Sequence, residues 1–302
     1  MENLIKKLDL NEYITNFSKL FAREKPIILE GDINIHYKII SELSKYNINQ
    51  PLSVQNLDSQ LMHLQKQGVL RVYEIYEFIK IINYFLYLKR FNFEGKLLEW
   101  MDKIIIPNDI LKICEYFDDK ANLKEGVDED FDNIKQAIYK NKEEIKQSLY
   151  KTINSSKIKP YLVDMQVHFI NEQECLLVRG GFNHILSGSV IDRSNSGFFY
   201  VIPHSVSDLK EKQSDLKNKQ EEILFRLCKE ISHIFERNLL FLKFINKEFD
   251  RFDHYQARIF FSKIGDKNFI LPSKKDENRL VDFCHPALSS PRPISIDFSK
   301  SV

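Results

Sequence analysis

The residues best suited to chemistry in this sequence occur in a short glycine-rich stretch. Arg179 precedes Gly180 and Gly181, and Asn183 and His184 follow. Glycine N–H groups and an arginine guanidinium are suitable partners for phosphate oxygens. Three further cations flank the stretch at some distance: Lys157, Lys159 and Arg193. These residues are predicted to contact a nucleic-acid backbone, with weak, salt-sensitive binding. A glycine-rich hairpin with ordinary surface charges is the alternative.

No catalytic residue is predicted in the chain. It contains no G-x-x-x-x-G-K-S/T phosphate loop, and no Ser or Cys has suggestive spacing from Asp253 and His254. Four acidic residues within 128–132 could indicate a metal site, but no histidine accompanies them. Because they begin a predicted helix, interaction with its N-terminal dipole is the simpler explanation. The sequence therefore predicts no enzyme activity, metal or cofactor for this chain, and an autonomous metal-dependent nuclease would lack its ligand cluster.

The composition favours a mainly helical protein. Of the 302 residues, 43% are hydrophobic, whereas glycine and proline number only nine each. A large β-sandwich or barrel needs more turn residues than that. Lysine plus arginine (44) nearly balances aspartate plus glutamate (43). The overall charge is therefore not that of a basic nucleic-acid-binding protein, and any such contact must be local.

A cytoplasmic protein without a membrane segment is expected. The N-terminus lacks the continuous apolar region of a signal peptide, and no apolar run reaches the roughly 20 residues of a membrane span. The cysteines are far apart and include no Cys-x-x-Cys pair, which argues against a zinc site or a disulfide framework. They are Cys114, Cys175, Cys228 and Cys284.

The elements that position the candidate residues follow from the hydrophobic period. Residues 1–126 show successive apolar stripes at helical spacing, which predicts a helical core. One stripe runs from Leu4 to Phe21. Another predicted helix has Ser53 as its N-cap and Gly68 as its closing glycine.

Two long helices are predicted to enclose a small β-unit. Residues 127–156 form an amphipathic, ascending helix with one narrow apolar stripe, and residues 205–262 descend as a second helix. Between them, residues 157–204 alternate apolar and other side chains and contain glycine turns, one of them at 194–197, which predicts antiparallel strands. A continuous helix over 205–253 would extend about 70 Å. It is expected to pack against 131–153 as a coiled-coil-like arm.

The C-terminal segment, 263–302, changes character again. Short apolar runs at 269–271, 280–283 and 294–298 alternate with prolines, which predicts extended strands. Three short strands without a covering helix make a poor domain on their own. The segment is therefore predicted to begin a truncated β-containing domain.

Motifs in four places resemble the bacterial MutS type II family. The most specific lies at 187–203 and reads S-G-S-V-I-D-R-S-N-S-G-F-F-Y-V-I-P, where the family has roughly G-x-V-H-D-x-S-x-S-G-x-T-x-F-x-E-P. The segments 64–70, 252–258 and 284–288 resemble the family's turn between core helices, the end of its lever and the start of its ATPase domain. The motifs occur in family order, so together they are more specific than each is alone.

The resemblance implies a particular fold. It is mainly α: a helical core with long antiparallel lever helices, a small inserted antiparallel β clamp at 157–204, and the C-terminal strands of a truncated ATPase domain. The chain is expected to be a fragment, because the phosphate loop and the Smr nuclease segment of the family do not occur in it. The clamp residues named above are the expected nucleic-acid contacts.

The resemblance also implies partners. Family members are cytoplasmic homodimeric ATPases and endonucleases that bind branched DNA and restrain recombination. Branched DNA is therefore the expected partner, and ATP with Mg is expected for the parent protein. Members are also linked to the rescue of stalled ribosomes, so a module that binds the ribosome or rRNA is the alternative.

Overall fold

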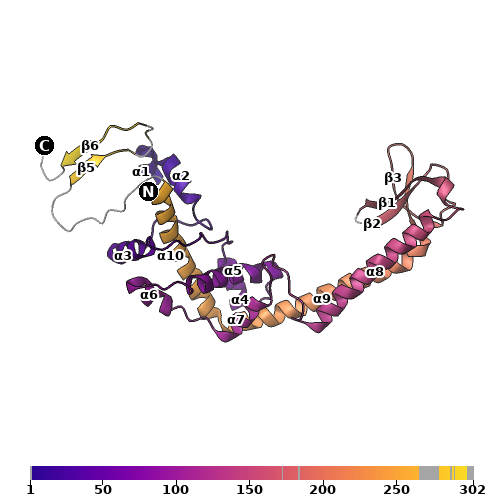
Figure 1. The fold of residues 1–302 in the computed structure, drawn as a ribbon, viewed down its shortest axis with the longest axis horizontal. Helices are drawn as coiled ribbons and strands as arrows, with labels where there is room; N and C mark the ends of the chain where they lie inside the picture. Colours follow the sequence, from indigo (N-terminus) through magenta and orange to yellow (C-terminus); the bar gives the residue numbers. More distant parts are fainter. Residues whose placement is uncertain are drawn as a thin grey trace. The chain divides into compact units, whose positions relative to one another are not determined.

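The computed structural model is mainly α-helical, as predicted (Figure 1). The chain divides into two compact units: residues 1–122 with 230–302 form the first unit, and residues 123–229 form the second unit. The predicted division into five segments is finer than this one and stays a prediction. The structure describes residues 2–171, 173–182, 184–264, 279–285, 288 and 290–297. The predicted strand at 269–271 and the candidate residue Asn183 lie outside that set.

The first unit is built around two helices, α5 (Val72–Leu88) and α10 (Leu239–Ile264). Seven apolar side chains of α5 are buried, and α10 contacts α3, α4 and α5. Burial of such side chains is the main contribution to the stability of a helical core. The remaining helices of this unit are α1 (Glu2–Lys7), α2 (Asn11–Ser18), α3 (Ile33–Leu43), α4 (Asp58–Gln65), α6 (Gly95–Asp102) and α7 (Asn108–Glu115).

Buried and half-buried ion pairs attach the segment before α3 to α10. The Arg23 guanidinium donates to both carboxylate oxygens of Asp250, at 2.8 and 2.7 Å. The Lys25 ammonium lies 2.6 Å from Asp253, which also accepts from the N–H of Ala22 at 2.9 Å. Buried charges are tolerated only when they are paired. This network therefore specifies how the segment 22–25 packs on α10.

The predicted apolar stripe from Leu4 to Phe21 is not one helix. It is divided into α1 and α2, because Asp9 has a left-handed backbone with φ +50°. A left-handed residue cannot continue a right-handed helix. The apolar spacing alone does not reveal this interruption.

The predicted caps of α4 are wrong by a few residues. Its N-cap is Leu57 rather than Ser53. At its C-terminal end, Gln67 has the left-handed backbone, with φ +59°, and Gly68 follows it. The N–H of Gly68 donates to the carbonyl of His63 at 2.9 Å, the long-range bond of a Schellman motif.

The continuous helix predicted over 205–253 is also interrupted. It forms α9 (Ser207–Arg237) and α10, which begins at Leu239. Between them, the N–H of Asn238 is shared between the carbonyls of Ile234 and Phe235, at 3.2 and 3.1 Å. The Asn238 side-chain amide donates to the same Ile234 carbonyl at 2.9 Å.

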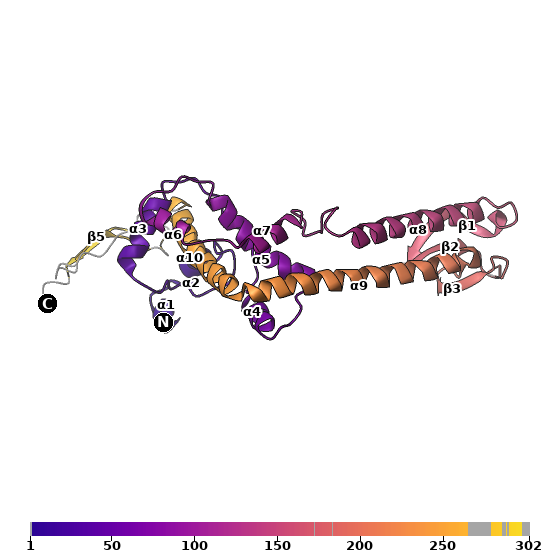
Figure 2. The same ribbon diagram turned by 90° about the horizontal axis from the view of Figure 1, so that it is seen from below.

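In the second unit, α8 (Glu129–Ile153) and α9 lie side by side and antiparallel (Figure 2). The side chain of Asn141 in α8 donates to the carbonyl of Leu209 in α9 at 3.1 Å. Towards the other end, Arg226 of α9 lies 2.9 Å from Asp128, the N-cap of α8. The predicted pairing of these two helices is therefore confirmed.

A four-stranded antiparallel sheet connects α8 to α9. Its spatial order is β1-β2-β4-β3. Ile145 and Leu149 of α8 and Val201 of β4 are fully buried in its core. The predicted strands and the turn at 194–197 are confirmed. The strands are β1 (Leu162–Ile170), β2 (Gln173–Val178), β3 (Gly188–Arg193) and β4 (Phe199–Pro203).

Two more strands lie in the C-terminal segment. β5 (Arg279–Phe283) and β6 (Ile294–Asp297) pair antiparallel. They correspond to two of the three predicted strands. Their assignment to an ATPase domain stays a prediction. Among the described helices, none has an apolar stretch long enough to cross a membrane.

Candidate nucleic-acid interface

The sheet register brings the candidate loops to one end of the second unit. Leu162, at the start of β1, pairs with Val178 at the end of β2. Val178 pairs in turn with Phe199 at the start of β4, and Phe199 pairs with Arg193 at the end of β3. The chain segments that precede β1, follow β2 and connect β3 to β4 therefore lie at the same end of the sheet.

Arg179 is anchored at this end by its backbone and by part of its side chain. Its N–H donates to the carbonyl of Tyr161 at 2.9 Å, and its Nε donates to the carbonyl of Leu162 at 3.2 Å. Arg179 is exposed, and the two terminal nitrogens of the guanidinium have no partner among the described residues. They are thus positioned to donate to a phosphate outside the protein.

Two glycines after Arg179 allow the backbone to turn closely against the next loop. A Cβ on Gly180 would lie 3.0 Å from the carbonyl oxygen of Gly197. Gly181 has φ +84°, a left-handed conformation that favours glycine. Gly197 also has a left-handed backbone, in the turn that follows Ser194. The loop after β2, which contains Gly180, is consequently in contact with the turn between β3 and β4, which contains Gly197.

The other predicted cations have different positions. Arg193 is exposed and its guanidinium lies 5.3 Å from the centre of the Phe199 ring. Lys157 and Lys159 are exposed between α8 and β1, and Lys159 begins a short 3-10 helix that leads directly into β1. His184 is exposed in the connection that runs to the start of β3, at the opposite end of the sheet.

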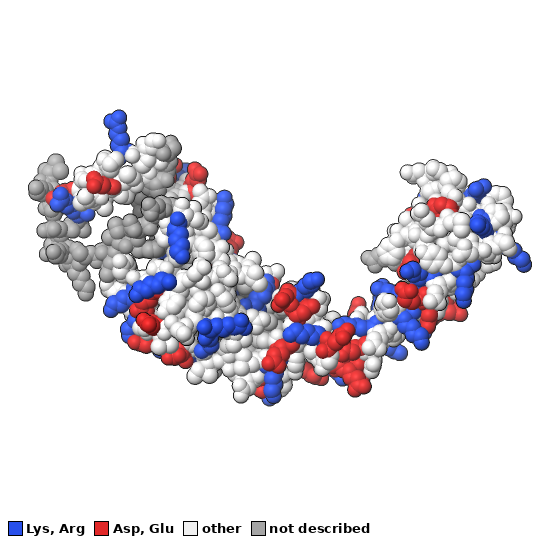
Figure 3. All heavy atoms as spheres, viewed as in Figure 1, with Lys and Arg blue, Asp and Glu red and all other residues white. Residues whose placement is uncertain are grey.

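The four cations Lys157, Lys159, Arg179 and Arg193, together with Gly180 and Gly181, form what we call the loop-end surface. None of its cations makes an ion pair within the described part of the chain. By contrast, Lys210 near the opposite end is half-buried and pairs with Glu174, and burial lowers the pKa of its ammonium. Figure 3 shows Lys and Arg side chains along the outer margin of this β-strand region.

The structure brings an aromatic pair together next to Arg179. The rings of Tyr161 and Phe182 lie 5.1 Å apart, and Phe182 is 41% exposed. Aromatic rings beside cations are suited to stacking on unpaired bases. In the sequence, Phe182 directly follows the two glycines, whereas Tyr161 lies 18 residues before Arg179, so their contact depends on the β1–β2 pairing.

Acidic groups near these loops have their own structural roles. Asp192 accepts from the N–H of Arg193 at 2.7 Å. At the far end of α8, Asp128 caps the helix by accepting from the N–H of Phe131 at 2.8 Å. Among the described residues, no group of three His, Cys, Asp or Glu side chains could hold a metal ion. Glu129, Asp130 and Asp132 lie in the first turn of α8, the position from which the predicted interaction with the helix dipole acts.

Comparison with known proteins supports the resemblance found in the motifs. No protein-family model matches the chain. Two proteins named endonuclease MutS2, from Helicobacter pylori strains ATCC 700392 / 26695 and J99 / ATCC 700824, are 32% and 33% identical to it over 305 aligned residues. The alignment includes 99% of this chain and 40% of each relative, so the chain spans about two fifths of their length. These similarities confirm the resemblance inferred from the motifs: the chain is related to the MutS type II family and matches part of these longer relatives.

Proposed function

We propose that this chain is the DNA-binding core and clamp region of a MutS type II protein that acts on branched DNA. In this proposal, the loop-end surface of the second unit contacts the phosphate backbone. The observation that carries it is the antiparallel register, which brings Arg179 and Arg193 to the edge where β1 begins.

The contact chemistry suits phosphates better than base edges. Lysine and arginine side chains on loops can follow a backbone of variable shape, and they carry little sequence information. Phe182 and Tyr161 offer a ring surface where a base is unpaired, as at a branch point. Structure-selective rather than sequence-selective binding is expected from this combination.

The activity of the longer protein belongs to the proposal as well. Both relatives are named endonucleases. We assign binding of DNA to the chain described above, and ATP, Mg and cleavage of DNA to the part of the parent protein beyond the aligned region. A cytoplasmic homodimer that restrains recombination is the corresponding parent protein.

A band-shift titration with a four-way junction and a linear duplex of equal length tests the proposal. The 302-residue chain should prefer the junction at low salt. With four phosphate contacts, the logarithm of its affinity should fall with the logarithm of salt concentration at a slope of about 3 to 4. A variant with all four loop-end cations changed to Gln should lose most of this slope.

The matched control changes four other exposed lysines of the second unit to Gln: Lys140, Lys142, Lys217 and Lys219. It removes the same charge from α8 and α9, so it should retain the junction preference. Equal losses in both variants would mean that net charge, not the loop-end surface, controls binding. Co-sedimentation with ribosomal particles in the absence of any junction preference would favour the ribosome-binding alternative.

A further inference from the structure

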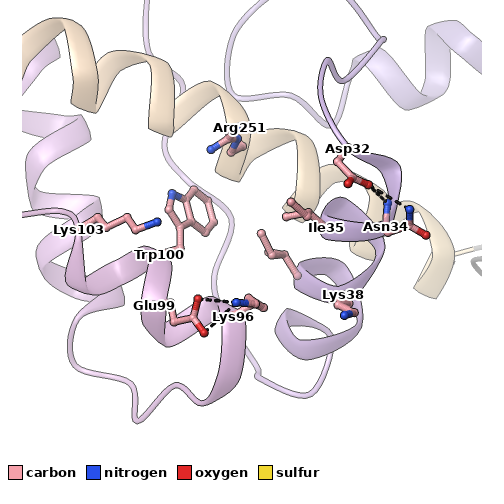
Figure 4. Close-up of a pocket in the computed structure, with 10 residues that line it drawn as sticks. Asp32, Asn34, Ile35, Lys38, Lys96, Glu99, Trp100, Lys103 and Arg251 are labelled. Carbon is pink, nitrogen blue, oxygen red and sulfur yellow. Dashed lines mark hydrogen bonds and ion pairs between the residues drawn. The ribbon is translucent and has the colours of Figure 1, made fainter.

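The first unit contains a cavity that the loop-end surface does not use. It has a volume of about 460 Å³ and lies between α3, α6 and α10 (Figure 4). Sites for small molecules commonly have volumes of about 300–1,000 Å³. The cavity is therefore large enough for a mononucleotide-sized ligand.

One wall of the cavity is apolar and held in place. It consists of Ile35 and Ile39 of α3 and the indole of Trp100 from α6. The Trp100 Nε1–H donates to the Glu248 carboxylate at 2.5 Å, and its ring stacks on Phe252 with the centres 5.9 Å apart. Ile35 is 50% exposed even though it belongs to the apolar stripe of α3. A ligand with a flat apolar body would cover this wall.

Cations from three helices surround that wall. Lys38 comes from α3, Lys103 follows α6, and Arg251 comes from α10. Figure 4 shows Lys103 and Arg251 extending towards Trp100 from different elements. Within the described residues, Lys38 and Lys103 have no ion-pair partner, and Arg251 has only a long contact of 3.4 Å with Glu248. Three cations thus remain available to an anion.

The two carboxylates at the cavity are already engaged. Asp32 accepts from the backbone N–H of Asn34 at 2.7 Å and from its side-chain amide at 3.1 Å. Glu99 pairs with Lys96 at 2.7 Å. Four cations and two carboxylates line the cavity, so the net charge of its lining residues is positive. An anionic group is therefore the favoured occupant near Lys103 and Arg251.

We propose that this cavity binds a phosphate group carried on a planar apolar body, the chemistry of a mononucleotide. The phosphate lies between Lys103 and Arg251, where charge-assisted hydrogen bonds are the strongest available. The planar body covers Ile35 and the edge of Trp100. The site is in the first unit and is separate from the loop-end surface, so either can fail a test without affecting the other.

The single tryptophan of the chain provides a direct probe. Trp100 is the only tryptophan in the sequence, so 5-fluorotryptophan labelling gives one ¹⁹F resonance that originates at the cavity wall. Adenosine monophosphate should shift this resonance saturably. Adenosine lacks the anion, so it should bind at least about tenfold more weakly, the effect of losing one charge-assisted contact. Inorganic phosphate keeps these contacts but lacks the planar body, so it should also bind at least about tenfold more weakly, because it buries no apolar surface.

Two variants and a control locate the phosphate. Lys103→Gln and Arg251→Gln should each weaken binding of adenosine monophosphate at least about tenfold. Lys66→Gln, which removes an exposed cation outside the cavity, should not change it. An unchanged ¹⁹F resonance of the free variants shows that the wall is intact. The proposal is overturned if adenosine or phosphate alone binds as tightly as the nucleotide, if neither cation matters, or if no saturable shift occurs.

Discussion

Gly188 illustrates, at the scale of single residues, how closely β3 approaches β4. A Cβ at this position would lie 2.2 Å from the carbonyl oxygen of Ile202 and 2.9 Å from a methyl group of Val201. The obstacle is mainly backbone, which cannot rotate away as a flexible side chain could. The need for glycine here is therefore steric, in keeping with its place in the motif at 187–203.

Replacing Gly188 by Ala should consequently destabilise the sheet. We expect Gly188→Ala to lower the free energy of unfolding by about 2–3 kcal/mol, the upper part of the range for overpacked positions. Gly180→Ala is the matched control, because its Cβ would lie 3.0 Å from a carbonyl oxygen and needs a smaller adjustment. Urea denaturation followed by circular dichroism measures both, and equal midpoints would contradict the steric explanation.

A buried histidine makes the first unit sensitive to acid. Burial, with the nearby cations Arg258 and Lys25, lowers the pKa of His254 to about 4 from an ordinary 6.5. The Nδ1 of His254 lies 3.1 Å from an Arg258 nitrogen, so it accepts a hydrogen bond as the neutral ring. The unfolded chain binds a proton on this histidine at a higher pH than the folded chain does. The stability that depends on the neutral ring is therefore fully present above pH 6.5. It is lost as the pH falls towards 4.

The expected loss between pH 7.5 and pH 5 is about 2 kcal/mol of unfolding free energy from His254. Urea titrations at the two pH values should show it in the wild type and much less of it in His254→Gln. Comparing the variants isolates His254 from Asp253, whose pKa burial raises and which acts in the opposite sense. His233→Gln, at an exposed position on α9, should keep the full pH dependence. The same dependence in His254→Gln would assign the effect to another group.

At the scale of elements, α8 has a well-defined start. Asp128 accepts from the N–H of Phe131 and also pairs with Arg226 of α9, so one side chain both caps the helix and connects it to its neighbour. Asp128→Ala should lower the stability of the second unit by about 1–2 kcal/mol, since both functions are lost. Glu129→Ala removes a charge from the same turn without removing the cap, so it should lower the stability by only about a few tenths of a kcal/mol. Thermal unfolding measures both, and similar melting temperatures would count against the capping role.

The division of the long C-terminal helical segment shows the limit of periodicity. The apolar spacing continues through Asn238 without Pro or Gly, which is why one helix is predicted. In the structure, the Asn238 side chain and N–H both bind carbonyls of the preceding turn, and α10 starts afresh one residue later. Asparagine readily competes for local backbone groups in this way, but its mere presence does not predict it.

At the scale of the whole molecule, the second unit has its own core and its own helix pair. Residues 123–229 should therefore unfold cooperatively when they are expressed alone. The reason is that the buried cluster from Ile145 to Val206 lies entirely inside this range. Calorimetry should show a single transition for 123–229. It should show none for 123–206, which lacks α9 and thus the partner of Asn141 and Asp128. A non-cooperative transition for 123–229 would contradict this independence.

The sequence by itself determined the local elements and the family relationship. Helix 129–153, the strands from Leu162 to Pro203 and the turn at 194–197 follow from hydrophobic period and turn residues, because such features depend on neighbours in the chain. The motif at 187–203, together with the three other motifs, carried the resemblance that the relatives confirm. The candidate cations were likewise predicted as residues that flank one tip.

Only the tertiary structure decided which of those residues meet. Strand register places Arg179 and Arg193 at one edge and directs the chain through His184 away from it. The cavity at Trp100 combines α3, α6 and α10, and α10 begins more than a hundred residues after α6 ends. No local pattern in the sequence indicates this cavity. The physical reason is that pairing and packing depend on burial shared between distant segments, whereas periodicity records only the face that each segment buries.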